Sequence, residues 1–153
     1  MGFIRSSVRL NASITQGMRF FLIENQIEKW LGKAIKVENK LKGIYHLKLE
    51  DQGLFWESQT TILEKDFEKC IKFDMMSPET QKSNLVEVYF MPCKSKTNYC
   101  TEIHVMHYGL TDEEKVFFQG FWQRKLNDLR QLCNGDWVIE DRDLSLSALR
   151  SSF

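Results

Sequence analysis

His107 is the side chain whose place in the sequence most invites a chemical role. It follows Ile103 and Val105 at every second position, which puts all three on the inward face of a predicted strand over residues 101–109. A buried imidazole there could orient a ligand or act as a general acid. The alternative is a structural histidine bonded to a backbone carbonyl, which the usual pairing of buried polar groups favours.

The other titratable residues do not form a catalytic or metal-binding set. His46 and His104 fall on outward positions of their strands, so the three histidines predict no metal site. Glu87 and Glu102 also fall on outward positions, which leaves no acid–base pair inside the fold. The sequence has no GxSxG motif, no phosphate-binding glycine loop and no HExxH motif. We therefore expect no metal and no cofactor, and a protein better suited to binding than to catalysis.

The four cysteines of the chain contain no CxxC pair. They are Cys70, Cys93, Cys100 and Cys133. Cys93 and Cys100 flank a polar loop at a spacing that does not suit zinc, and a disulfide across this hairpin is one alternative. Because the sequence shows no secretion signal, we expect free thiols in a reducing compartment instead.

Length and charge narrow the class of protein. The chain has 153 residues, with 21 basic and 21 acidic side chains. This length suits one domain with its own core. Balanced charge argues against nucleic acid or an anionic membrane as a partner, since both select a basic surface. No apolar run reaches transmembrane length and no signal peptide is evident, so we expect no membrane insertion and a cytoplasmic location. We also expect a monomer or weak dimer.

Residues 111–133 are predicted to form the one long helix. Thr111 and Glu114 make a capping box, and three acidic residues occupy the first turn, where the helix dipole favours negative charge. The apolar residues that follow recur at helical spacing, and they are Phe117, Phe118, Phe121, Trp122, Leu126, Leu129, Leu132 and Cys133. Asn134 and Gly135 are expected to end the helix as a left-handed cap.

Gly120 interrupts this helix, where a glycine costs about 1 kcal/mol relative to alanine. One interpretation is that it leaves room for a ligand beside Trp122. The other, which we favour, is a glycine tolerated for packing.

Most of the preceding chain alternates with a period of two, which indicates strands. Strands are predicted over residues 3–10, 34–41, 45–50, 55–63, 70–75, 85–91 and 101–109. In the second of these, Ile35 and Val37 should share one face. Residues 64–66 are predicted as a charged turn. Two short helices should follow the first strand, over residues 13–23 with a Ser13–Gln16 capping box and over residues 26–31 with Asn25 as cap.

These elements predict an α+β fold of two layers, in which a curved antiparallel sheet of six or seven strands wraps round the long helix. The domain should span residues 1–135. Residues 136–153 are expected to be a C-terminal extension that lies on the surface or is mobile. Alternatively, Leu144, Leu146 and Leu149 could dock on a partner or across the mouth of a cavity.

Three motifs, taken in order, resemble the helix-grip fold shared by START lipid-transfer domains and the birch-pollen-allergen (Bet v 1-like, SRPBCC) superfamily. They are Lys29-Trp30-Leu31-Gly32 after the short helices, Thr101-x-Ile103-x-Val105-x-His107-x-Gly109-Leu110 in the last strand, and Trp122-x-x-x-Leu126-x-x-Leu129 in the long helix. Within this superfamily the chain resembles the branch named for the activator of the ATPase of heat shock protein 90. The resemblance covers residues 3–132. That branch often has glycine directly before the helix tryptophan, where this chain has Phe121, a difference that would narrow a cavity.

The resemblance implies a cavity between the long helix and the sheet that binds a hydrophobic or amphipathic small molecule, such as a lipid, sterol or polyketide. The candidate ligand-binding residues are Trp30, Tyr45, Leu47, Phe73, Val88, Phe90, Val105, His107, Phe118, Phe121 and Trp122. Alternatively, these side chains simply fill the core. Two other functions remain open, a co-chaperone-like or regulatory protein-binding module that contacts a chaperone or another protein, and a cyclase- or hydrolase-like enzyme that uses His107 or Tyr45.

Overall fold

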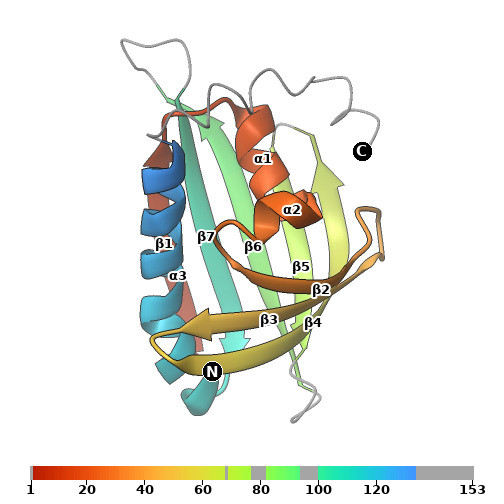
Figure 1. The fold of residues 1–153 in the computed structure, drawn as a ribbon. Helices are drawn as coiled ribbons and strands as arrows, with labels where there is room; N and C mark the ends of the chain where they lie inside the picture. Colours follow the sequence, from red (N-terminus) through yellow and green to blue (C-terminus); the bar gives the residue numbers. More distant parts are fainter. Residues whose placement is uncertain (1, 68, 77–81, 94–99, 134–153) are drawn as a thin grey trace.

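A curved antiparallel sheet forms one layer of the molecule. The computed structural model describes residues 2–67, 69–76, 82–93 and 100–133 (Figure 1). Within these residues seven strands pair in the order β1-β7-β6-β5-β4-β3-β2. They are β1 (Gly2–Leu10), β2 (Gly32–Val37), β3 (Ile44–Asp51), β4 (Leu54–Asp66), β5 (Cys70–Met76), β6 (Ser83–Pro92) and β7 (Thr101–Leu110). The last six strands form a meander, and β1 joins its far edge beside β7.

The helices form the second layer, and they lie together on one face of the sheet (Figure 1). They are α1 (Ile14–Leu22), α2 (Glu24–Ile27) and α3 (Asp112–Cys133). Helix α3 packs along β1 and β7, and α1 packs against β6 and β7. The predicted two-layer architecture, with a bent sheet holding one long helix, is confirmed.

Two predicted capping boxes are present. At α1 the Gln16 amide donates to the Ser13 hydroxyl and the Ser13 amide donates to the Gln16 side chain, both at 3.2 Å. At α3 the Glu114 amide donates to the Thr111 hydroxyl at 3.2 Å, and the Thr111 amide donates to the Glu114 carboxylate at 2.9 Å. Local sequence therefore sets where both helices begin.

The second short helix differs from its prediction. Helix α2 begins at Glu24, earlier than expected, and its N-cap residue is Ile23 rather than Asn25. Ile23 ends α1 in an extended conformation and has no side-chain capping bond. The two helices share this one residue as their junction, which leaves no separate turn for Asn25 to cap.

Two strands also depart from the predicted pattern. In β2 the register shifts between Ala34 and Lys36, so Ala34 faces the core and Ile35 is 51% exposed. The shared face predicted for Ile35 and Val37 is therefore wrong. The predicted turn over residues 64–66 is part of β4, because a register shift after Ile62 lets the strand continue pairing with β5.

The prediction of free thiols is wrong for one pair of cysteines. Cys93 and Cys100 form a disulfide, and their Cα atoms are 5.2 Å apart. Antiparallel pairing of Pro92 with Thr101 brings the two cysteines opposite each other. Cys70 and Cys133 are free and buried.

In the described part of the chain, no helix combines the length and the apolar character needed to cross a membrane. The cap predicted at residues 134–135 and the extension predicted over residues 136–153 lie outside the described residues. The domain boundary at residue 135 therefore stays a prediction.

Gly120 makes room for an arginine that ties α3 to the sheet. Arg124 Nε donates to both carboxylate oxygens of Asp51, at 2.9 and 3.1 Å. Asp51 ends β3 just before Gln52 and Gly53, which have φ of 52° and 80° and form a two-residue hairpin turn. A Cβ on Gly120 would lie 2.5 Å from Arg124 Nη1. These contacts support the packing interpretation of Gly120.

The packing role of Gly120 can be tested with two substitutions. In an Arg124→Ala background, Gly120→Ala should raise the free energy of unfolding by about 1 kcal/mol, because alanine is the better helix former. With Arg124 present, the gain should be smaller or reversed, because the added methyl group displaces the guanidinium. Urea unfolding of the four variants measures both effects. Equal gains in the two backgrounds would contradict the proposed packing.

Candidate binding site

Aromatic side chains pack closely together along the first half of α3. Phe117 stacks on Trp56 with ring centroids 5.4 Å apart, and on Phe121 at 5.3 Å. Phe118 contacts Phe121 edge-on at 5.5 Å and the His107 ring at 4.6 Å. Such offset and edge-on pairs add to the stability that burial already gives. This end of the fold is core and lines neither the cavity nor the groove described next.

A small apolar cavity of about 20 Å³ lies between α3 and the sheet. Its exposed atoms are all apolar, and its lining residues are Phe21, Leu31, Tyr45, Leu47, Thr60, Phe73, Met75, Val86, Val88 and Trp122. A space of this size holds about one water molecule, but apolar cavities tend to stay dry. As it stands, the cavity is too small for a ligand.

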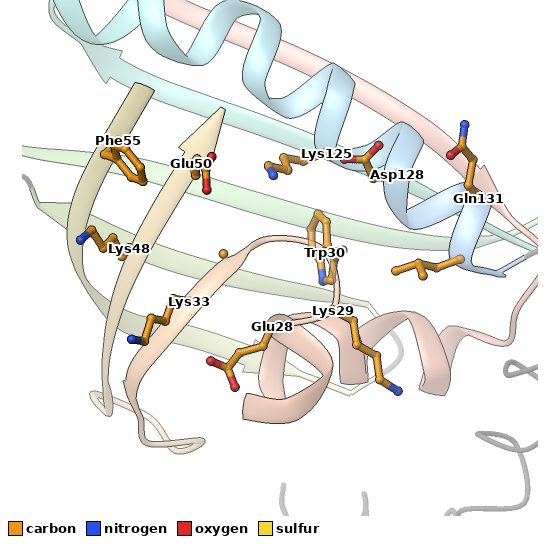
Figure 2. A pocket seen from close by; sticks show the side chains of 12 residues that line it. Glu28, Lys29, Trp30, Lys33, Lys48, Glu50, Phe55, Lys125, Asp128 and Gln131 are labelled. Atoms are coloured by element: carbon orange, nitrogen blue, oxygen red, sulfur yellow. The ribbon is translucent and has the colours of Figure 1, made fainter. Parts of the chain in front are cut away.

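A much larger groove opens beside it, at the second half of α3 (Figure 2). Its volume is about 800 Å³, and it is open to solvent. The groove is lined by Glu28, Lys29, Trp30, Gly32, Lys33, Lys48, Glu50, Phe55, Lys125, Asp128, Gln131 and Leu132. These residues come from the α2–β2 segment, from β3 and β4, and from α3. The groove therefore has a few apolar residues within a largely charged lining.

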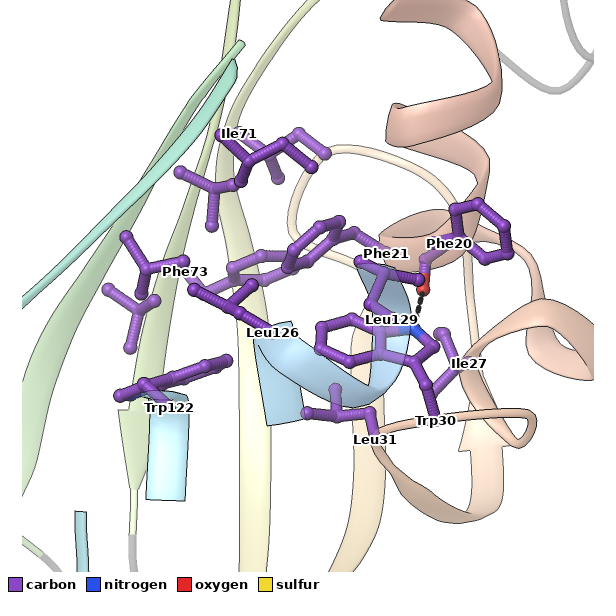
Figure 3. Packing of buried hydrophobic residues seen from close by; sticks show 14 of the residues in the cluster. Phe20, Phe21, Ile27, Trp30, Leu31, Ile71, Phe73, Trp122, Leu126 and Leu129 are labelled. Atoms are coloured by element: carbon purple, nitrogen blue, oxygen red, sulfur yellow. Dashed lines mark hydrogen bonds between the residues drawn. The ribbon is translucent and has the colours of Figure 1, made fainter. Parts of the chain in front are cut away.

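Two aromatic rings stand between the groove and the cavity. Trp30 lines the groove, and its indole N–H donates to the Phe20 carbonyl at 2.8 Å (Figure 3). Phe21 lines the cavity and meets the Trp30 ring edge-on at 4.9 Å. The groove and the cavity thus lie next to each other, with a lining ring of one in contact with a lining ring of the other.

The structure brings together only some of the predicted ligand-binding residues. Tyr45, Leu47, Phe73, Val88 and Trp122 line the cavity, and Trp30 lines the groove. The remaining predicted residues line neither space and are buried in the core; they are Phe90, Val105, His107, Phe118 and Phe121. The charged groove residues were not predicted. Their only sequence signal was the outward position of residues such as Lys48, which is shared by most surface residues.

His107 belongs to a buried chain of hydrogen bonds. Trp122 Nε1 donates to His107 Nδ1 at 3.1 Å, and because an indole N–H can only donate, the proton of the neutral ring sits on Nε2. Nε2 then donates to Asn84 Oδ1 at 2.5 Å, and Asn84 Nδ2 donates to Glu114 Oε2 at 2.8 Å. The histidine is therefore structural, but its partners are side chains rather than the predicted backbone carbonyl.

Neither proposed acid–base residue is free to react. Both ring nitrogens of His107 are engaged, and burial lowers the pKa of His107 to about 3, so the ring is neutral at pH 7. The Tyr45 hydroxyl donates to the Leu22 carbonyl at 3.1 Å, and burial raises the pKa of Tyr45 far above its ordinary value. Among the described residues, no three His, Cys, Asp or Glu side chains gather as metal ligands would.

A curved antiparallel sheet closed over one long helix, with two short helices after its first strand, is the helix-grip fold. Solved structures share it across most of the chain. Protein CV1439 from Chromobacterium violaceum has a TM-score of 0.74 and 18% identity over 89% of this chain and 100% of its own. The Aha1 dimer from Colwellia psychrerythraea has a TM-score of 0.70 and 13% identity over 87% and 96% of the two chains. CalU16 from Micromonospora echinospora has a TM-score of 0.66 and 17% identity over 97% and 95%.

No family model and no curated protein matches the sequence. At these identities the structural likeness shows the fold alone. The narrower resemblance to the activator of the heat shock protein 90 ATPase stays a prediction.

The cavity can be tested by adding one methyl group at matched positions. Val88 and Val105 are buried cross-strand partners, but only Val88 lines the cavity. Val88→Ile should leave the free energy of unfolding unchanged or raise it by up to about 1 kcal/mol, because the methyl group has space to enter. Val105→Ile should lower it by about 1–3 kcal/mol through overpacking. Urea unfolding measures both, and equal losses would show that the space is not there.

The burial of neutral His107 predicts how stability depends on pH. The unfolded histidine titrates near its ordinary value of 6.5 and the folded one near 3, so the unfolded state binds more protons between these values. The free energy of unfolding should therefore fall as the pH drops below 6.5, by up to about 1.4 kcal/mol per pH unit from this residue. Urea unfolding between about pH 6.5 and 5 should show a shallower fall for His107→Gln than for the parent.

His46→Gln is the matched control for this measurement, because it removes a histidine from the outer side of β3 and leaves the hydrogen bonds of His107 in place. The flattening of the pH slope described above should belong to His107→Gln and not to histidine removal in general. If His107→Gln kept the parent's slope, the histidine would not be held neutral by the fold.

Proposed function

We propose that the chain binds an amphipathic small molecule in the groove beside α3, without catalysing a reaction. One observation carries this proposal: an open groove of about 800 Å³ lies one pair of rings away from an apolar cavity under α3. Small-molecule sites span about 300–1,000 Å³ and combine apolar walls with a few polar groups. The groove has a volume in this range, and Trp30, Phe55 and Leu132 give it a small apolar surface within its charged lining.

The lining of the groove suits a ligand with two unlike ends. Trp30, Phe55 and Leu132 offer apolar contacts, and charged side chains surround them. An apolar tail laid on these three residues loses contact with water, while a polar head stays among the charges. If the Trp30 and Phe21 rings shift apart, the tail gains access to the cavity, whose exposed surface is apolar.

Two alternatives have less support. A co-chaperone-like or regulatory role rests on resemblance and fold likeness alone. A cyclase- or hydrolase-like reaction at His107 or Tyr45 would first have to break the hydrogen bonds that occupy these side chains. A monomeric or weakly dimeric protein and a cytoplasmic location stay predictions.

A matched pair of exposed residues tests the groove. Leu54 and Phe55 are neighbours in β4 and each is 61% exposed, but only Phe55 lines the groove. Decan-1-ol, a neutral amphiphile, should bind the parent protein in a calorimetric titration. Phe55→Ala should weaken this binding by about fivefold, because the tail loses an apolar contact.

Leu54→Ala should leave the affinity for decan-1-ol unchanged, and both variants should keep the parent's melting temperature because neither side chain is in the core. Absence of binding to the parent, or equal weakening by the two substitutions, would argue against the groove as the site.

A further inference from the structure

We propose that the polar end of the ligand is an anionic group, a carboxylate or a phosphate, held by Lys33 and Lys48. This inference rests on the proposed function and deepens it by naming the charge of the ligand. The two lysines line the groove from β2 and β3 (Figure 2).

The sheet holds these two like charges directly opposite each other. Lys33 and Lys48 are cross-strand partners, so their side chains leave the same face of the sheet side by side. The neighbouring pair, Gly32 and Leu49, fixes this register, because a Cβ on Gly32 would lie 2.5 Å from the Lys48 carbonyl oxygen. Like charges placed opposite each other in this way destabilise a sheet. An anion between them would remove the repulsion and bind both.

Neither lysine forms an ion pair with a carboxylate of the described residues, although two other lysines of the same sheet do. Lys36 lies 3.9 Å from Glu38, and Lys72 pairs with Glu64 at 3.1 Å and with Glu87 at 3.3 Å. Lys40, which follows β2, lies 3.8 Å from Glu38. Lys33 and Lys48 therefore keep their charges available to a ligand.

An aromatic ring, rather than a carboxylate, lies beneath the Lys48 ammonium group, and the same holds for Lys125 across the groove. Lys48 Nζ is 5.4 Å from the centre of the Phe55 ring. Lys125 Nζ, from α3 on the other side of the groove, is 5.9 Å from the centre of the Phe121 ring. A cation over an aromatic face is favourable but keeps its charge, and it can still donate hydrogen bonds to an anion.

The groove also contains three acidic residues, Glu28, Glu50 and Asp128, beside its four lysines. Glu28 Oε2 accepts the Ala34 amide at 3.2 Å, and Asp128 lies on α3 near Lys125 (Figure 2). Among the described residues none of these carboxylates forms an ion pair with Lys33 or Lys48, so both ammonium groups stay available to an anion. Trp30 is three residues before Lys33 in the chain, and Phe55 lies beneath the Lys48 ammonium group. An amphiphile with its head between Lys33 and Lys48 could therefore lay its tail on the apolar residues of the groove.

Calorimetric titration at pH 7.5 with ligands of one chain length tests this inference. The probes are decanoate, decyl phosphate, decan-1-ol and decyltrimethylammonium. The parent protein should bind decanoate, decyl phosphate or both about five to ten times more tightly than decan-1-ol, and the cationic probe most weakly. Added salt should reduce the preference for the anion. Whichever anion binds more tightly identifies the group.

The variant Lys33→Gln/Lys48→Gln should lose this preference, so that it binds the anions no more tightly than it binds decan-1-ol. Its melting temperature should be unchanged or higher, because the repulsion is gone. The control Lys36→Gln/Lys40→Gln removes the same charge from nearby residues that are paired with Glu38, and it should keep the preference.

Two results would overturn the inference alone while leaving the proposed function in place. One is equal binding of decan-1-ol and both anions to the parent. The other is a preference for anions that survives in Lys33→Gln/Lys48→Gln or is lost equally in the control. If none of the four probes bound the parent, both the inference and the proposed function would fail.

Discussion

The buried chain of hydrogen bonds from Trp122 through His107 and Asn84 to Glu114 fixes half of the long helix. It begins in the middle of α3, crosses β7 and β6, and returns to the first turn of α3, where Glu114 also accepts the Thr111 amide. Each of these groups is buried, and leaving one unsatisfied costs about 1–3 kcal/mol. The first half of α3 therefore cannot lift from the sheet without breaking several bonds together.

The two halves of α3 are held to the sheet in different ways. Where the hydrogen bonds and the aromatic rings hold α3, the space between helix and sheet is full. Beyond Trp122 the helix keeps Leu126 and Leu129 in the core, while its Lys125, Asp128 and Gln131 line the open groove. The main polar link on that side is the pair between Arg124 and Asp51, which is partly exposed. One half of the helix is thus closely packed, while the other borders the open groove.

Much of the fold could be predicted from the sequence, because burial of one face imposes a period on each element. The long helix and the inward residues of β7 follow from this period, and the capping boxes set where α1 and α3 begin. The same reasoning failed at Ile35, where a bulge turns the side chain outward, and at residues 64–66, where a charged run continues the strand instead of ending it. Such shifts depend on the partner strand. The disulfide between Cys93 and Cys100 likewise depends on how two strand ends meet.

The candidate site was less predictable than the fold. Phe21, Leu31 and Met75 line the cavity and were not among the predicted ligand-binding residues. Alternation of apolar and polar residues predicts which side chains face inward, but it does not predict how completely they fill the core. In a closely packed core, a space of this size can depend on a single methyl group. The groove is built from charged residues of four separate segments, each of which resembles ordinary surface when taken alone. Only the register of β2 against β3 reveals that Lys33 and Lys48 are neighbours.

The pairing of β1 with β7 also has a consequence for how the chain reaches its native state. The Thr101 hydroxyl donates to the Ala12 carbonyl across 89 positions of sequence, beside the pairing of Leu10 with Thr101. On the ribosome β1 is made before the other strands of the described residues, yet the strand it pairs with among them, β7, is made after all the others. The hairpins from β2 to β7 can form as they emerge, whereas β1 must wait, and closing so large a loop makes its docking a late, slow step. Until then both edges of β1 and the outer edge of β7 are unpaired, and this is the period when a nascent chain is most exposed to misassociation.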